Sequence, residues 1–255
     1  MWGYILVLTI IALVLFLLIV ILSFKEIFKT KDANFKEYSE EKPRTTQRAA
    51  SFMEQTSYTI SEIVNDPGIN GEYQLYKYLI YYAGEDAKIL CNLYPRLNDD
   101  NSTQVDAVLI NSDGIFVFES KNCSGDIYGN EYDEHWLKIR YKDKTSVRFQ
   151  NPLNQNLNHI KMLEKILGDD YNFYSVIAFS NNATIRNRYD YDDTFVVRYE
   201  NIGQVLDRVK NINLDCSHLD QERIDKIFNE LKKYLNPPAY IKAKHLSYAK
   251  TQHRN

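Results

Sequence analysis

Residues 104–122, with the sequence QVDAVLINSDGIFVFESKN, decide the fold. Two mainly apolar runs, residues 105–110 and 115–118, flank the segment Asn-Ser-Asp-Gly at 111–114. Short apolar runs that are bounded by a turn signal are typical of buried β-strands. We therefore predict a hairpin at the centre of a β-sheet.

Three charged residues lie within this predicted hairpin: Asp106, Glu119 and Lys121. Side chains alternate between the two faces of a strand, so Glu119 and Lys121 share one face. A loop made of Ser112 and Asp113 places Asp106 opposite Glu119, and a loop shifted by one residue places it opposite Lys121. In both registers the three side chains share a face, with cross-strand Cβ separations of roughly 5 Å. A loop of odd length would separate them.

Charged groups inside a buried strand need partners, because an unpaired buried carboxylate is costly. Two carboxylates at this separation also raise each other's pKa unless a cation lies between them. One interpretation is a structural ion pair between Asp106 and Lys121. The other is a divalent-metal site with a lysine beside it, which suits phosphodiester hydrolysis. The spacing alone leaves both interpretations open.

Asp106, followed by Glu119 and Lys121 with one residue between them, resembles the PD-(D/E)xK nuclease signature. The surrounding residues are more specific, and in their order and spacing they resemble the NERD (nuclease-related) domain over roughly residues 68–167. The segments that carry this resemblance are Gly71-Glu72, Tyr94-Pro95, TQVD at 103–106, GIFVFESKN at 114–122, GDIYG at 125–129, Trp136 and NPLNQ at 151–155.

The resemblance implies an α/β fold of the restriction-endonuclease-like type, a mixed central β-sheet flanked by helices. It implies that Asp106 and Glu119 hold Mg²⁺ or Mn²⁺, with Glu72 as a third acidic ligand, and that Lys121 orients the attacking water or neutralises developing charge. Gln155 then orients this lysine or the DNA. The expected partner is nucleic acid, DNA in preference to RNA. The alternative is a non-catalytic nucleic-acid-binding or scaffolding module that retains the nuclease fold.

Two of these residues also have simpler interpretations. Asn70 is predicted to cap a helix that runs to about residue 83, so Glu72 falls in its first turn, where the helix dipole favours a carboxylate. Asn151 and Pro152 predict the start of a second helix, which runs to about residue 167. Gln155 and His159 lie four residues apart on one face of that helix. Both fit a solvent-facing role, and we expect this role for His159.

Composition narrows the class of protein. The chain has 255 residues and a formal net charge of −3, so nucleic-acid binding would depend on a local basic patch. Its three cysteines, Cys91, Cys123 and Cys216, have no CxxC spacing and are odd in number. A reducing compartment is therefore expected, without disulfide bonds or a zinc ribbon.

Residues 2–24 form an uncharged run rich in Leu, Ile and Val. As a helix this run reaches roughly 34 Å, enough to cross a bilayer core of about 30 Å. A cleaved signal peptide and a buried helix are the alternatives, but no basic residue precedes the run and no small-residue cleavage site follows it. Because lysines cluster behind it, we predict a single-pass anchor in the cell membrane with the C-terminal side in the cytoplasm. These are Lys25, Lys29, Lys31 and Lys36.

The rest of the chain divides by composition. We predict a transmembrane anchor at 1–24, a polar juxtamembrane linker at 25–66, a nuclease-like core at 67–179, a C-terminal α/β extension at 180–238 and a basic tail at 239–255. Further strands are expected at 88–93, 127–128, 136–141, 145–149, 173–179 and 194–197, and an amphipathic helix that ends before Pro237. The tail is interpreted as a solvated segment, with contact to DNA or anionic lipid as the alternative.

Overall fold

A computed structural model describes residues 50–96, 102–187, 189, 191–213 and 218–242. The predicted anchor at residues 2–24, Cys216 and residues 243–255 of the tail lie outside the described residues. Among the helices that are described, none is both long enough and apolar enough to cross a membrane.

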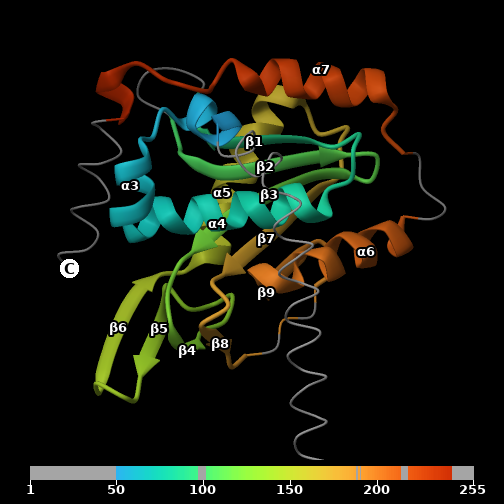
Figure 1. The fold of residues 1–255 in the computed structure, drawn as a ribbon. Coiled ribbons are helices and arrows are strands. Elements are labelled where there is room, and N and C mark those ends of the chain that lie inside the picture. The colour runs from blue at the N-terminus through green and yellow to red at the C-terminus, as the bar shows by residue number, and fades with distance from the viewer. Residues whose placement is uncertain (1–49, 97–101, 188, 190, 214–217, 243–255) are drawn as a thin grey trace, which may run out of the picture. The chain divides into compact units, whose positions relative to one another are not determined.

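The centre of the fold is a five-stranded mixed sheet in the order β1-β2-β3-β7-β9. The first three strands run antiparallel, and β7 and β9 continue parallel to β3. The predicted mixed α/β architecture is confirmed (Figure 1). The strands are β1 (Lys88–Leu93), β2 (Val105–Asn111), β3 (Gly114–Lys121), β7 (Phe173–Phe179) and β9 (Thr194–Arg198).

The hairpin between β2 and β3 has the two-residue loop formed by Ser112 and Asp113. Asn111 pairs with Gly114, and the register continues to Ala107 opposite Phe118. One position further along, Asp106 stands opposite Glu119. The first of the two predicted registers is therefore the observed one.

Helices cover both faces of this sheet. On one face, α4 (Pro67–Tyr82) and α6 (Ile202–Ile212) pack against side chains that include Leu109 and Phe118. On the other face, α5 (Pro152–Leu167) and α7 (Gln221–Lys232) pack against side chains that include Val108 and Val117. Because neighbouring residues of β2 and β3 belong to different faces, each strand reads as a continuous apolar run that is buried on both sides.

The segment before α4 is also part of the folded unit. Residues 50–56 are helical, Phe52 is fully buried, and α3 (Ile60–Asn65) contributes Ile63 to the same core as α4. A short 3-10 helix, η1 (Tyr199–Asn201), leads from β9 into α6.

The start of α4 differs from the prediction. Asp66 is the N-cap, and its carboxylate accepts hydrogen bonds from the backbone of Gly68 and Ile69. Pro67 occupies the first turn, where its missing N–H costs nothing. The predicted cap at Asn70 is therefore wrong. Glu72 lies beyond the first turn of α4, so the helix dipole stabilises its carboxylate only weakly.

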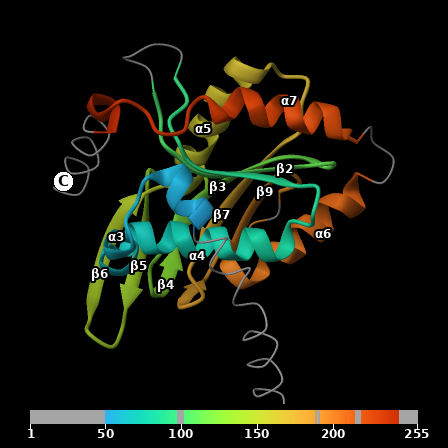
Figure 2. The same cartoon turned by 45° about the horizontal axis from the view of Figure 1, so that its top comes forward.

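A second, four-stranded sheet lies beside the first, in the order β6-β5-β4-β8. Its strands are β4 (Gly125–Tyr128), β5 (His135–Arg140), β6 (Thr145–Gln150) and β8 (Ala183–Ile185). Trp136 is fully buried and stacks on Phe179 of the central sheet, with ring centroids 6.2 Å apart. Gly129 allows this packing, because a Cβ there would meet the indole at 2.2 Å. From this packed base, β5 and β6 extend as a two-stranded ribbon (Figures 1 and 2).

Candidate active site

Asp106, Glu119 and Lys121 lie on the sheet face that α5 covers. Strand alternation places them on the same side as Val108 and Val117, which pack against α5 and α7. Glu119 is buried, with 8% of its side chain exposed, whereas 22% of the Lys121 side chain is exposed. The predicted grouping of the three charged residues on one face is thus present.

Lys121 is held by two partners. Its Nζ lies 2.6 Å from Oε1 of Glu119 and donates a second hydrogen bond, of 2.9 Å, to Oε1 of Gln155. The predicted structural ion pair between Asp106 and Lys121 is replaced by one between Glu119 and Lys121. Gln155 reaches this position from the first turns of α5, whose N-cap is Asn151, as predicted.

His159 belongs to the same network. Its Nε2 lies 3.1 Å from Oε2 of Glu119, and its Nδ1 lies 2.8 Å from Oγ1 of Thr103. His159 is buried, so the expectation that it faces solvent is wrong. The signal that could have revealed its role is its position four residues after Gln155, since a helix face that holds one partner of the hairpin also holds the next.

Asp106 faces the same site from β2. Its Oδ2 accepts a hydrogen bond of 2.7 Å from the backbone N–H of Ser120. Burial and the neighbouring Glu119 carboxylate raise the pKa of Asp106 to about 7. The side chain of Ser120 lies on the opposite face of β3, where its hydroxyl is 2.7 Å from that of Tyr199.

Glu72 approaches the two hairpin carboxylates from α4. Its Oε2 is buried and has no hydrogen-bond partner among the described residues. Burial, Asp106 and Glu119 together raise its pKa well above the ordinary value. Glu72 therefore lies close enough to Asp106 and Glu119 for their charges to act on it, while no hydrogen bond joins it to the other predicted residues among those described.

Glu119 has the opposite shift. Burial acts to raise its pKa, but Lys121 and His159 outweigh burial and hold the pKa of Glu119 at about 2. For Lys121, burial acts to lower the pKa, and Glu119 and Asp106 reverse the effect and raise it. One ionised carboxylate and one ammonium thus stand beside two carboxyl groups that retain protons at higher pH.

The carboxylates supply oxygen donors of the kind that Mg²⁺ and Mn²⁺ prefer. Yet within the described part of the chain, no three His, Cys, Asp or Glu side chains are arranged to hold a metal ion as they stand. At Glu119, both carboxylate oxygens are already engaged, one by Lys121 and the other by His159. The donor chemistry fits a hard cation, and a ligand cage would require these side chains to move.

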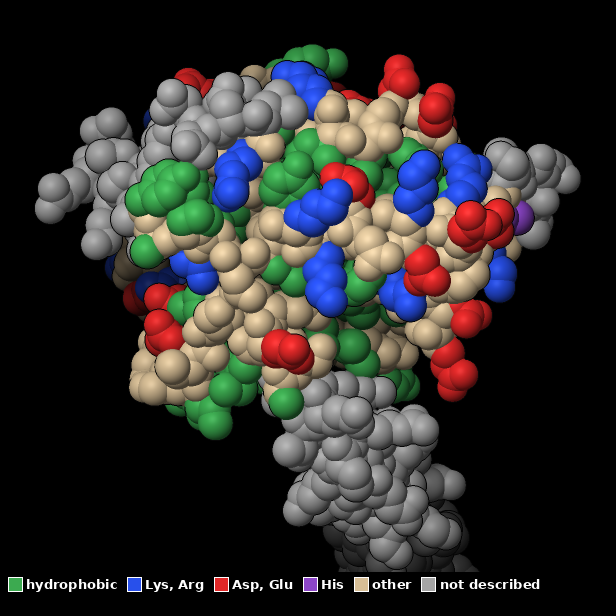
Figure 3. All heavy atoms as spheres, turned by 90° about the horizontal axis from the view of Figure 1, so that it is seen from above, with side chains coloured by type: hydrophobic (Ala, Val, Ile, Leu, Met, Phe, Trp, Pro, Cys, Tyr) green, Lys and Arg blue, Asp and Glu red, His purple; other side chains and the backbone are tan. Residues whose placement is uncertain are grey.

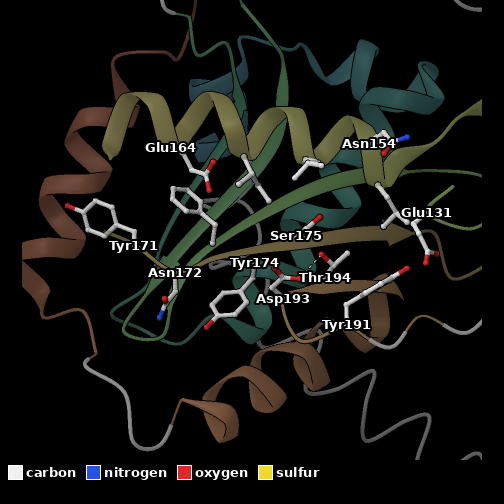
Figure 4. Close-up of a pocket in the computed structure, with 14 residues that line it drawn as sticks. Glu131, Asn154, Glu164, Tyr171, Asn172, Tyr174, Ser175, Tyr191, Asp193 and Thr194 are labelled. Carbon is white, nitrogen blue, oxygen red and sulfur yellow. Dashed lines mark hydrogen bonds between the residues drawn. The ribbon is translucent and has the colours of Figure 1, made fainter. Parts of the chain in front are cut away.

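The face seen in Figure 3 carries Lys and Arg side chains interspersed with Asp and Glu. A separate groove of about 500 Å³ runs between α5 and strands β7 and β9 (Figure 4). Its lining includes Glu131, Glu164 and Asp193 but none of the site residues described above, so its charge does not suit a phosphate backbone.

Comparison with known proteins bears on the same segment. The family model described as Nuclease-related domain (NERD) matches residues 67–180. An uncharacterized protein of Bacillus anthracis is 26% identical over 149 residues, which cover 58% of this chain and 67% of that protein. No solved structure matches the chain significantly. The family match therefore supports the NERD resemblance of residues 67–180, the segment that contains the whole candidate active site.

Proposed function

We propose that residues 67–180 form a restriction-endonuclease-like domain that hydrolyses phosphodiester bonds in nucleic acid, DNA in preference to RNA. The observation that carries this proposal is the bonding of Lys121 to Glu119 and Gln155 beside Asp106, with the buried carboxyl group of Glu72 close enough for both hairpin carboxylates to raise its pKa. A structural ion pair needs one carboxylate for one lysine. The raised pKa values of Asp106 and Glu72 mark two further carboxyl groups that have no cationic partner among the described residues, and a divalent cation would supply one.

Mg²⁺ or Mn²⁺ is the proposed cofactor, held by Asp106, Glu119 and Glu72. The buried Glu72 Oε2 supports this choice, because it is a carboxylate oxygen without a hydrogen-bond partner among the described residues. When bound, such an ion lowers the pKa of a coordinated water and stabilises charge on the phosphate.

The other residues have roles that follow from their contacts. Lys121 presents a fixed ammonium to the negative charge that develops on the phosphate or to the attacking water. Gln155 orients that ammonium through its 2.9 Å hydrogen bond. His159 is a positioning residue, since it contacts the second oxygen of Glu119 and is itself held by Thr103.

We also propose that residues 2–24 anchor the protein in the cell membrane with the nuclease domain in the cytoplasm. The support comes from the sequence alone: an uncharged apolar run of spanning length, followed by lysines.

The test is cleavage of DNA and RNA by the full-length protein in neutral detergent with Mg²⁺ or Mn²⁺. Asp106→Asn and Glu119→Gln should each reduce cleavage by about 100-fold or more and weaken Mn²⁺ binding in calorimetry. Asp169→Asn, which changes an exposed carboxylate near the end of α5, is the matched control and should leave both unchanged. Wild-type protein that neither binds a divalent ion nor cleaves would remove the proposal.

A second candidate is a non-catalytic nucleic-acid-binding or scaffolding module. It is favoured by the engagement of both Glu119 oxygens and by the lack of a three-ligand metal arrangement among the described residues. This candidate predicts nucleic-acid binding without cleavage and without a divalent ion.

A further inference from the structure

Residues 125–150 are inserted between two residues of the candidate site. β3 ends at Lys121, and α5 supplies Gln155 shortly after the segment ends. The 2.9 Å hydrogen bond between Lys121 Nζ and Gln155 Oε1 joins the two ends of this insertion. Strands β4, β5 and β6 are therefore attached to the site at both ends.

The outer part of the insertion is an extended hairpin. β5 and β6 pair along their whole length, from His135 opposite Gln150 to Arg140 opposite Thr145. Six strand residues span roughly 20 Å, and both ribbon views show this hairpin extending from the rest of the fold (Figures 1 and 2). Its base is held by the buried Trp136, so its direction is set by packing.

The hairpin is basic although the chain is not. Residues 134–150 contain five Lys or Arg and two acidic residues, a formal charge of +3 in a chain of −3. Arg140 forms an ion pair with Asp143 at 2.8 Å and donates a hydrogen bond to the hydroxyl of Thr145. The other cations form no ion pair within the described part of the chain: Lys138, Lys142, Lys144 and Arg148.

The hairpin also lies close to the candidate site. Cys123, two residues after Lys121, packs against the hydrophobic cluster that contains Trp136, and Phe149 of β6 packs against the same cluster. The base of the hairpin is therefore packed beside the end of β3 that carries Lys121. Tyr132 and Tyr141, 89% and 66% exposed, lie on either side of β5 in sequence and offer aromatic rings to solvent.

We propose that the β5–β6 hairpin is an arm that binds the phosphate backbone of the nucleic acid on which the site acts. The arm pairs unpartnered cations and exposed aromatic rings, the two features with which proteins hold nucleic-acid strands without reading sequence. At 3.4 Å per nucleotide, a reach of roughly 20 Å places these contacts up to about six nucleotides from the site. The inference rests on the proposed function for the identity of the substrate.

The test compares two four-fold variants of the full-length protein. The arm variant carries Lys138→Gln, Lys142→Gln, Lys144→Asn and Arg148→Gln; asparagine is chosen at position 144 because the backbone there has a φ of 54°. The control variant removes the same charge from exposed lysines of α5 and α7: Lys161→Gln, Lys165→Gln, Lys226→Gln and Lys232→Gln. Circular dichroism and thermal melting establish that both are folded.

Binding is measured by fluorescence anisotropy with a labelled 20-base-pair DNA duplex in EDTA, over a range of salt concentrations. Each phosphate contact contributes about 0.9 to the slope of log K against log salt. Lys138 and Arg148 lie on opposite faces of the ribbon, so about two to three contacts are expected at once. The arm variant should therefore lose about 2 to 3 from this slope and bind at least 10-fold more weakly. The control variant should change the slope by less than about 1. The proposal would be overturned if both variants lost the same amount of DNA affinity, or if the arm variant bound DNA as tightly as the wild type.

Cleavage in Mg²⁺ or Mn²⁺ separates this inference from the function on which it rests. If the wild-type protein binds DNA through the arm but cleaves no nucleic acid, the proposed role of the arm is supported and the proposed nuclease activity is refuted. Cleavage that the arm variant retains in full at low salt, where phosphate contacts contribute most to binding, removes the arm and leaves the nuclease standing. A wild-type protein that neither binds nor cleaves nucleic acid removes both.

Discussion

At the scale of single residues, the two carboxylates that face each other across β2 and β3 are made chemically unequal by their neighbours. Both are buried, but Glu119 is bonded to Lys121 and His159, whereas Asp106 is bonded, among the described residues, to the backbone N–H of Ser120 alone. The pKa of Glu119 therefore falls to about 2 while that of Asp106 rises to about 7. Carboxyl groups whose pKa values are pushed apart by their surroundings are common at functional sites.

Lys121→Ala separates charge stabilisation from metal binding. The variant should lose about 100- to 1000-fold in cleavage, since one electrostatic stabiliser is removed. Its affinity for Mn²⁺ should be equal to or higher than that of the wild type, because a nearby positive charge is gone and an oxygen of Glu119 is released. Calorimetry and single-turnover cleavage measure the two effects. A parallel loss of metal affinity would place Lys121 in a structural role instead.

Asp106→Asn tests the raised pKa through stability. A carboxyl group whose pKa is 3.8 when exposed and about 7 when folded contributes stability at low pH that is lost as the pH rises through 7. Asparagine does not titrate and can still accept the Ser120 hydrogen bond. In EDTA, the variant should therefore gain melting temperature relative to wild type, and gain more at pH 8 than at pH 5. Asp169→Asn serves as the exposed control, and an Asp106→Asn gain that is the same at both pH values would contradict the shift.

At the scale of elements, α5 is the helix that assembles the site. Asn151 caps it, and Gln155 and His159 project from one of its faces to Lys121 and Glu119. The buried Asn156 ties the helix to the sheet, because its Nδ2 donates to the carbonyl of Val117 at 2.8 Å and to Oγ of Ser175 at 2.9 Å.

Asn156→Ala should therefore weaken both the fold and the site. Loss of these buried hydrogen bonds should lower the free energy of unfolding by about 1–3 kcal/mol. The released helix should also shift Gln155 and His159, so cleavage should fall in conditions where the variant is folded. Urea unfolding measures the stability. Asn158→Ala, at an exposed position on the same helix, should change it by less than about 0.5 kcal/mol.

At the scale of the whole molecule, the central sheet separates two packed layers, and the site lies on the layer formed by α5 and α7. Glu72 is the exception, since it comes from α4, which covers the opposite face. The site can therefore form only when both layers are packed against the sheet.

The proposed anchor belongs to this scale. Full-length protein should sediment with membranes and resist carbonate extraction, because residues 2–24 hold an apolar run of spanning length. Deletion of residues 1–24 should release the protein into the soluble fraction. Protein that carbonate removes from membranes would contradict the anchor, and a C-terminal reporter active only outside the cytoplasm would contradict its orientation.

Much of the fold could be predicted from local patterns. The strands at 88–93 and 173–179 and the helix at 152–167 have the bounds that were predicted, because each is a short apolar run or a capped amphipathic segment. The start of α4 was missed although a local signal marks it. Asp66 and Pro67 repeat the cap-and-proline pair of Asn151 and Pro152.

The sequence by itself determined that Glu119 and Lys121 share one face and predicted that Asp106 joins them if the loop is even in length, because side chains alternate along a strand. The structure supplied the two-residue loop that meets this condition. Only the tertiary structure decided which groups pair with them. Lys121 binds Glu119 and Gln155, His159 joins from α5, and Glu72 arrives from α4, all across separations that no local pattern encodes. The pKa values of these groups could not be predicted from the sequence either, because they depend on burial and on charges that folding brings close.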